Sequence, residues 1–275
     1  MVQKNISIRN TSEINNLFIE TGRNYFAIFS TDALAEKING LEVFTFNKSI
    51  SFAEVFQAVA LQSFLMENKE ALVNVAFQNP YAYCIPNEYY NEEQTEYYRE
   101  LLNASYSALD YASVMNNLTV KYFVPEEMVN LLKRNFSSLR VTHKYSTIIR
   151  QATKNISDKE NYVYVVFYEQ VMIVTVFKNN ALQIINSFEF TTETDVAYHL
   201  LNVIAQIDID KNNVQLILSG QISAAGNLYA LLYTYFSDII FDESANAAMP
   251  DYDATNHLEA HYFSPYLCNI AYFEK

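Results

Sequence analysis

Two histidines placed four residues apart are the most direct candidates for metal chemistry in the sequence. His257 and His261 enclose Glu259 in the segment His-Leu-Glu-Ala-His. On a helix this spacing brings both imidazoles to one face, where a zinc ion could bind. The segment follows neither the HExxH nor the HxxEH order of zinc enzymes, and no further cluster of ligands accompanies it. We interpret these histidines as packing or surface residues and predict no metal site.

Glycine, which phosphate-binding loops need, is scarce in this chain. The 275 residues include four glycines, Gly22, Gly40, Gly220 and Gly226. A backbone that wraps closely around a phosphate uses glycine because a Cβ atom blocks the approach. The sequence also lacks a Walker loop, a GxSxG elbow and a Cys–His pair placed for nucleophilic catalysis. This pattern favours a protein without catalysis, while the enzyme question stays open.

The charge balance restricts the class of partner. The chain has 18 basic and 31 acidic residues, and its net charge is −13. We therefore expect no nucleic acid partner, because like charges repel, whereas a basic face of another protein would fit.

The N-terminal stretch lacks the apolar run of a secretory signal, and no segment approaches the ~18 apolar residues that cross a bilayer. Cys84 and Cys268 form no metal-spaced pair and are expected to be reduced thiols. These features predict a cytoplasmic protein without membrane insertion.

The sequence shows the same order of elements twice. Residues 41–60 align with residues 185–204 without a gap, at an offset of 144, so that Phe44 meets Phe188. In each copy an alternating strand precedes a polar turn with a helix N-cap, expected at Ser51 and Thr194. Amphipathic helices are then predicted over residues 52–66 and 195–207, followed by apolar strands over 72–77 and 214–218.

Each copy also begins with a predicted hairpin and a second turn. The hairpins join residues 17–19 to 25–29 and residues 162–167 to 171–177, and the second turns lie at 38–40 and 178–180, where Asn and Gly tolerate positive φ. Each module therefore has the order β-β-β-α-β-α-β, which predicts an α/β fold with mixed sheets. We expect a first module over residues 1–157, with an inserted or extended strand–helix region of about 80 residues, and a second over residues 158–275.

This duplicated order, together with segments such as residues 214–228 (VQLILSGQISAAGNL), resembles the actin-like ATPase superfamily with its ribonuclease H-like fold. That superfamily includes sugar kinases, heat-shock chaperone ATPases and actin. More narrowly, the chain resembles an uncharacterised bacterial family typical of Bacteroidetes. In active members of the superfamily each hairpin carries an acid-x-Gly phosphate loop, and a Gly-rich turn in the second half holds adenosine.

The resemblance implies four candidate nucleotide-binding residues. Glu20 and Gly22 match the acid-x-Gly loop, with Glu in place of Asp and bulky Arg23 following, and Gly220 and Gly226 match the adenosine turn. The second hairpin turn, residues 167–171, contains no glycine. A structural interpretation is the alternative: Gly22 supplies positive φ in a hairpin, Glu20 is a solvated strand end, and Gly220 ends a strand. We prefer this alternative because half of the phosphate cradle is missing.

The expected function is therefore a non-catalytic actin-like module that binds another protein, as an adaptor or as a homodimer, with a degenerate nucleotide site and no cofactor. The rival hypothesis is an ATP-binding ATPase or kinase-like enzyme that holds Mg-ATP through atypical phosphate loops.

Overall fold

The computed structural model describes residues 1–9, 16–32, 37–47, 49–67, 72–115, 117–154, 157–246 and 258–273. These residues form two compact units, one within residues 1–147 and 269–273 and the other within 148–246 and 258–268. Helices α4 (Lys144–Ala152) and α7 (Ala260–Phe273) each contain residues of both units. In the described part of the chain, no helix is long and apolar enough to span a membrane.

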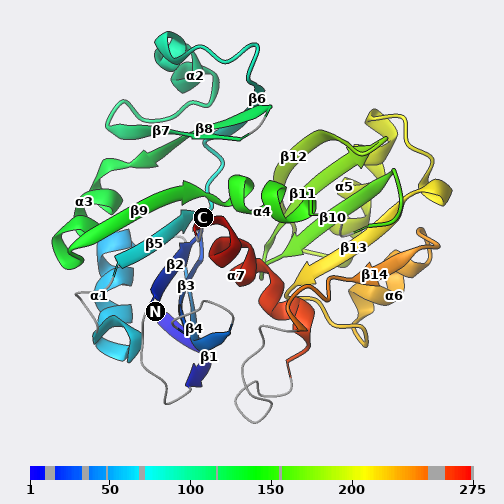
Figure 1. Ribbon diagram of the computed structural model, residues 1–275. Coiled ribbons are helices and arrows are strands. Elements are labelled where there is room, and N and C mark those ends of the chain that lie inside the picture. The colour runs from blue at the N-terminus through cyan, green and yellow to red at the C-terminus, as the bar shows by residue number, and fades with distance from the viewer. Residues whose placement is uncertain are drawn as a thin grey trace. The chain divides into compact units, whose positions relative to one another are not determined.

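The first unit contains a six-stranded sheet with the strand order β1-β4-β3-β2-β5-β9 (Figure 1). Strand β2 pairs antiparallel with β3 and parallel with β5, and β5 pairs parallel with β9. The strands are β1 (Val2–Arg9), β2 (Asn16–Thr21), β3 (Tyr25–Thr31), β4 (Ile38–Phe46), β5 (Leu72–Phe77) and β9 (Ser138–His143).

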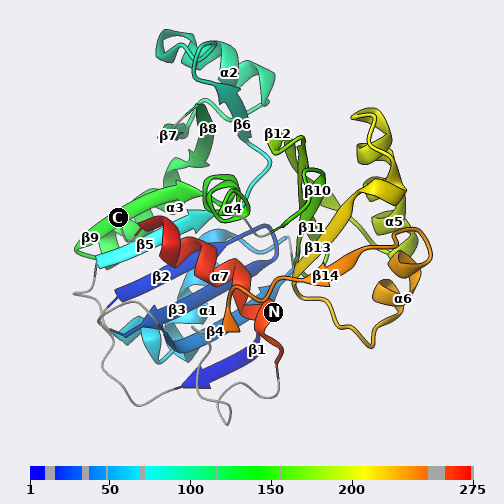
Figure 2. The same cartoon turned by 45° about the vertical axis from the view of Figure 1, so that its right-hand side comes forward.

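Alternating side chains give this sheet two distinct faces, because neighbouring residues of a strand point in opposite directions. Phe18 of β2 stacks on its cross-strand partner Phe29, with ring centroids 5.1 Å apart. Phe273 of α7 lies on this same face, 6.4 Å from Phe18. Phe26 belongs to the opposite face and contacts Phe56 of α1 (Phe52–Gln62). The end of α7 and helix α1 therefore cover opposite faces of the sheet (Figure 2).

Local sequence signals account for the helices of the first unit. Helix α1 begins with a capping box, in which Ser51 and Glu54 bond to each other's backbone amides. It ends before Ser63, whose hydroxyl donates to the buried carboxylate of Glu42. A 3-10 helix, η1 (Leu65–Glu67), follows. Helix α3 (Glu126–Asn135) has acids in its first turn and bases in its last, which suits the helix dipole.

A second, smaller sheet is inserted between β5 and α3. Its strand order is β6-β8-β7, formed by β6 (Ala82–Pro86), β8 (Leu118–Pro125) and β7 (Ala108–Val114). A 3-10 helix, η2 (Glu92–Gln94), runs into α2 (Thr95–Leu101), which lies over this sheet (Figure 1). Tyr98 of α2 packs with Phe123 of β8 in a small apolar core. We call these elements together the inserted layer.

The second unit contains a five-stranded sheet with the order β12-β11-β10-β13-β14. Helices α5 (Glu193–Gln206) and α6 (Asn227–Tyr233) form an apolar core with the sheet residues that face them, including Val163, Val165 and Leu216. The remaining elements are β10 (Tyr162–Phe167), β11 (Val171–Lys178), β12 (Ala181–Glu189), the 3-10 helix η3 (Lys211–Asn213), β13 (Gln215–Gly220) and β14 (Ile239–Phe241).

The two large sheets share one arrangement of five strands. The order β4-β3-β2-β5-β9 in the first unit corresponds to β12-β11-β10-β13-β14 in the second. The first two pairings of each series are antiparallel and the last two are parallel. Each unit thus contains the expected β-β-β-α-β-α-β order, and the first adds β1 at an edge and the inserted layer before α3.

Two local predictions were wrong, and one was confirmed. Residues 38–40 lie inside β4 and form no turn, because Gly40 pairs with both Arg9 and Ser30 on the two sides of the strand. The cap of α5 is Thr192, which forms a capping box with Asp195, and Thr194 lies inside the helix. The predicted turn at 178–180 is present, since Asn179 and Asn180 have φ values of 52° and 60°.

Candidate functional site

Glu20 is the centre of a buried polar network in the first unit. Its side chain lies on the sheet face that α7 covers, because it shares the orientation of Phe18 two residues earlier. Lys144 Nζ donates to Oε2 of Glu20 at 2.7 Å, and Asn269 Nδ2 donates to the same oxygen at 2.6 Å. The hydroxyl of Tyr25 donates to Oε1 at 2.8 Å. Both oxygens of this carboxylate therefore accept hydrogen bonds from within the protein.

Lys144 reaches Glu20 because of the direction of the strands. Lys144 begins α4 directly after β9, and Glu20 lies near the end of β2, in a series where β2, β5 and β9 are parallel. Parallel strands bring their carboxyl ends to one edge of a sheet. Lys144 also donates to Oδ1 of Asn269 at 3.1 Å, so Glu20, Lys144 and Asn269 each bond to the other two. The side chains of Glu20 and Lys144 both have zero exposed fraction.

The interpretation of Glu20 as a solvated strand end was wrong. A buried carboxylate is tolerated when it is paired and hydrogen-bonded, and here an ammonium group supplies the compensating charge. The amine of Lys144 thus places a positive charge directly beside the carboxylate. The arrangement is a buried ion pair whose carboxylate also accepts hydrogen bonds from Asn269 and Tyr25.

Gly22 does not have the positive φ that we expected of a hairpin glycine. Among the described glycines, Gly220 has one. A Cβ atom at position 22 would instead overlap the ring of Tyr25 and come within 2.7 Å of Gln78 Oε1. Glycine is therefore required here by the close packing of the Tyr25 ring, whose hydroxyl bonds to Glu20.

The corresponding hairpin turn of the second unit joins β10 to β11. Tyr168 closes it by donating its amide to the carbonyl of Val171 at 2.8 Å. The Tyr168 side chain is buried, while Glu169 and Gln170 are exposed. The turn contains a large side chain where the superfamily places a glycine, so its backbone has no open approach of the acid-x-Gly kind.

Gly220 is fixed by its own backbone conformation. It has a φ of +84°, and a Cβ atom there would overlap the carbonyl oxygen of Phe167, its partner on β10. The next amide, Gln221, donates to that same carbonyl at 2.8 Å. A left-handed residue at this point allows the chain to turn out of β13 while it stays in contact with β10.

Gly226 has an ordinary conformation. It caps α6 with a φ of −84°, and a Cβ atom would have the Ser223 carbonyl oxygen as its nearest neighbour, at 3.1 Å. The turn before it is held by His261, whose Nε2 lies 2.6 Å from the carbonyl oxygen of Ile222.

His261 is a buried packing residue, with its ring centroid 4.4 Å from that of Phe241. Its ring also pairs with Glu259 at 3.4 Å. His257, the other member of the predicted imidazole pair, lies outside the described residues. Within the described ranges, no group of three or more His, Cys, Asp or Glu side chains is arranged to hold a metal ion.

A second buried titratable group adjoins Lys144. The ring of His143 is fully buried; its Nε2 lies 3.1 Å from the carbonyl oxygen of Asn79, and its Nδ1 accepts the amide of Tyr145 at 3.1 Å. These contacts hold the neutral ring with its proton on Nε2. Burial lowers the pKa of His143 to about 3, because the charged ring would lose its hydration.

The structure thus places the four predicted residues in two pairs. Glu20 and Gly22 belong to the first unit, and Gly220 and Gly226 belong to the second. The sequence analysis missed Lys144, Tyr25 and Asn269. Lys144 could be inferred only once the sheet order was known, since a buried acid near the end of β2 requires a cation and Lys144 follows β9, the second parallel strand along from β2.

Comparison with known proteins identifies the fold. The profile of the family described as "Protein of unknown function (DUF3822)" matches residues 3–239. A crystal structure of a Bacteroides thetaiotaomicron protein, described as having an actin-like ATPase fold and unknown function, aligns with a TM-score of 0.74 at 18% identity. The alignment covers 90% of this chain and 97% of that one.

A structure described as the PilM-PilN type IV pilus biogenesis complex aligns with a TM-score of 0.65 at 8% identity, over 95% of this chain and 99% of that one. No curated protein matches the sequence. The chain has the actin-like ATPase fold, as the order of its elements predicted, and the predicted resemblance to a bacterial family with this fold is confirmed.

Proposed function

Because the chain belongs to the DUF3822 family, we propose that it is a non-catalytic actin-like module that binds another protein, with a degenerate nucleotide site. The observation that carries this proposal is the ion pair between Glu20 and Lys144. By the resemblance to actin-like ATPases, Glu20 is at the position of the acid that helps to hold magnesium and phosphate in active members. Here that acid is neutralised by the protein's own lysine.

Magnesium binding at Glu20 would have to displace Lys144. Mg²⁺ binds through carboxylates, waters and phosphates in near-octahedral geometry and needs an available oxygen. Each oxygen of Glu20 already accepts a hydrogen bond from Lys144, Asn269 or Tyr25. Displacing the ammonium group would leave a buried charge without its partner, which costs about 3–5 kcal/mol. The cluster therefore opposes the metal-assisted phosphoryl transfer on which ATPases depend.

The glycine positions also support a degenerate nucleotide site. Gly22 leaves room for the ring of Tyr25, and Gly220 adopts the left-handed backbone conformation of a turn. The second hairpin turn contains Tyr168 in place of a glycine. Each of these residues has a packing role that needs no phosphate. ATP binding through atypical loops is the alternative function.

Protein binding is supported by three independent features. A strongly acidic chain offers a surface for basic partners. The PilM-PilN structure, which shares the fold, is described as a complex between proteins. The inserted layer carries several exposed aromatic side chains, Tyr83, Tyr89, Tyr97 and Tyr106. As part of the same proposal, we place the protein in the cytoplasm, where its two free cysteines would stay reduced.

We also propose that the two modules arose by internal duplication, with modules over residues 1–157 and 158–275. The shared order of five strands supports this origin. So do the matched capping boxes, Ser51 with Glu54 and Thr192 with Asp195.

Thermal melting with Mg-ATP tests the non-catalytic assignment. We expect no change of the melting midpoint at millimolar Mg-ATP, with magnesium alone as the control. A ligand at ~100 times its Kd would add about 2.7 kcal/mol to the stability of the folded state. A clear upward shift that Gly226→Trp abolishes would overturn the proposal and establish nucleotide binding, because this substitution fills the predicted adenosine turn.

A further inference from the structure

The inserted layer carries an unusual concentration of tyrosine. Eight of the 22 tyrosines fall within residues 81–111. Several are strongly exposed, including Tyr89 (71%), Tyr97 (59%) and Tyr106 (78%). Leu101, also half exposed, follows Tyr97 by four residues on α2, so the two side chains share one outward face of the helix. Such a grouping of exposed aromatic and apolar residues is typical of interaction surfaces.

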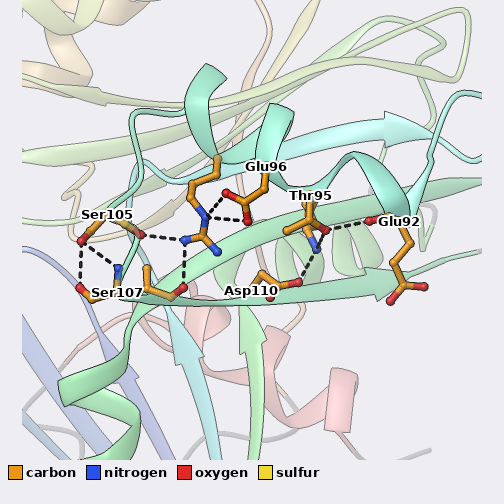
Figure 3. A network of polar contacts seen from close by, with 9 residues as sticks. Glu92, Thr95, Glu96, Ser105, Ser107 and Asp110 are labelled. Atoms are coloured by element: carbon orange, nitrogen blue, oxygen red, sulfur yellow. Dashed lines mark hydrogen bonds and ion pairs between the residues drawn. The ribbon is translucent and has the colours of Figure 1, made fainter.

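The basic residues of the layer are directed inwards. Arg99 of α2 is buried; its guanidinium lies 4.7 Å from the centre of the Phe123 ring. It donates to the carbonyl oxygens of Ser105 and Ala108 at 2.7 and 3.0 Å, and it pairs with Glu96 (Figure 3). Arg99 therefore ties α2 to the segment that leads into β7.

Lys121 on β8 is buried in the same way. Its Nζ donates to Oδ2 of Asp110 at 2.7 Å and to Oγ1 of Thr95, the first residue of α2, at 3.1 Å (both partners are labelled in Figure 3). The side chain is 2% exposed, whereas that of Asp110 is 45% exposed. The side chain of Lys121 thus holds the layer together and is almost entirely shielded from solvent.

The acids of the layer remain outside. Glu88, Glu92, Glu93 and Glu100 are all exposed. Among the residues that the structure describes, none pairs with their carboxylates. Glu100 follows Tyr97 by three residues on α2, so it lies beside the exposed aromatic face. Glu93 belongs to η2, which runs directly into the first turn of α2. Arg99 and Lys121 are the basic residues between positions 81 and 125, and both are buried, so the described outer surface of the layer has negative charge with no exposed cation.

We propose that this surface, formed by Tyr97, Leu101 and the flanking Glu93 and Glu100, binds an arginine-containing basic segment of another protein. The proposal rests on the proposed protein-binding function and names its surface and the chemistry of its partner. Guanidinium groups stack on tyrosine rings and form paired hydrogen bonds with carboxylates. Arginine therefore satisfies the aromatic and the acidic components of this face together.

The negative charge of this surface disfavours two other partners, a second copy of the chain and a nucleic acid. A second copy of the chain also has a net charge of −13, and two copies of this surface would place carboxylates against carboxylates. A nucleic acid would bring phosphates to an anionic surface, which is repulsive for the same reason.

The test uses the full chain and fluorescein-labelled octa-arginine, with fluorescence anisotropy as the readout and octa-glutamate as the control peptide. At ~0.15 M salt the screening length is ~8 Å, so distant charges contribute little. The aromatic component is tested by Tyr97→Ser, with Tyr198→Ser as the matched control, since Tyr198 is 64% exposed in the second unit. The double variant Glu93→Gln with Glu100→Gln tests the acidic component. The double variant Glu160→Gln with Glu169→Gln, in the second unit, is its matched control.

We expect Tyr97→Ser to weaken octa-arginine binding about threefold, and the three changes at the surface together to weaken it about tenfold, or about 1.4 kcal/mol. Tyr97→Phe should retain binding because it keeps the ring. The control variants should stay within about twofold of the unaltered protein. Melting midpoints verify folding, which these exposed positions should leave intact.

Three results would overturn the proposal. The surface and control variants could weaken octa-arginine binding equally, or octa-glutamate could bind as tightly as octa-arginine. In the third, Tyr97→Ser would change self-association in sedimentation and leave octa-arginine binding unchanged. None of them bears on Mg-ATP, so the melting experiment judges the non-catalytic assignment separately.

Discussion

Lys144 donates from Nζ to Oε2 of Glu20 across 2.7 Å, although 124 positions separate the two residues in the sequence. Neither side chain has any exposed area. The pair joins the end of a central strand to the start of a helix that follows the edge strand of the same sheet. A carboxylate that could serve a ligand is thereby made part of the core.

Breaking this pair should destabilise the protein strongly. Lys144→Met removes the ion-pair partner of the buried Glu20 carboxylate and is expected to lower the free energy of unfolding by about 3–5 kcal/mol. Urea unfolding followed by circular dichroism measures the change. Glu20→Gln, which leaves the ammonium group unpaired, should have a comparable effect.

The double variant, Lys144→Met with Glu20→Gln, is the control for this interaction. It removes both charges, so we expect it to be more stable than either single variant. Additive losses in the double variant would show that the two side chains contribute independently, contrary to the pairing described above.

Gly220 and Gly226 should respond differently to alanine. Gly220→Ala places a Cβ atom on the Phe167 carbonyl at a φ of +84° and should cost several kcal/mol, at least ~2. Gly226→Ala, at a φ of −84°, should cost about 1 kcal/mol or less. Urea unfolding compares the two variants, and equal losses would contradict the assigned conformations.

His143 should make stability depend on pH. Its folded pKa is lowered to about 3, whereas an unfolded histidine takes up a proton near 6.5. The unfolded chain therefore binds more protons between these values. The contribution of His143 is complete above about pH 6.5, and the free energy of unfolding should fall by about 1.4 kcal/mol per pH unit as the pH drops towards 3.

Unfolding measurements at intervals from pH 7 to pH 4 can isolate this contribution. His143→Gln is the control, because an amide side chain can keep polar contacts with Asn79 and Tyr145 but has no proton to gain. A slope that is the same in both proteins would show that His143 is not the group responsible.

The thiol of Cys84 should be unreactive in the folded protein. Cys84 is half-buried, and the partial burial of its thiol raises the pKa to about 12, so at pH 8 only about one molecule in ten thousand carries the thiolate. Cys268 is buried and donates to the carbonyl of Ser264. We expect no reaction with a disulfide reagent at pH 8 and reaction of two thiols after unfolding in urea. Rapid labelling of the folded protein would contradict the low thiolate fraction of Cys84 and the burial of Cys268.

The elements that the sequence predicted are those with strong local signals. The hairpin of β10 and β11 follows from two apolar runs, and the turn at Asn179 and Asn180 follows from residue types that accept positive φ. Strand β7 was missed because residues 108–114 mix small, polar and apolar side chains, and its identity depends on pairing with β8. Helix α7 was missed because it contains Pro265 and lacks clear end signals.

The site was harder to predict than the fold because its contacts are long-range. Glu20 could be identified from its place in a hairpin, but its environment depends on residues from α4 and α7. Lys144 could be inferred only after the parallel order of β2, β5 and β9 was known. No local signal points to Asn269, which lies 249 positions from Glu20.

That separation has a consequence for synthesis. A ribosome adds ~5–20 residues per second, so Glu20 emerges roughly 12–50 s before the amide of Asn269 that completes its hydrogen bonds. During this interval the nascent first unit carries a carboxylate without its full set of donors. The hydrogen bonds of Glu20 are thus completed only when a residue 249 positions further along the chain has been made.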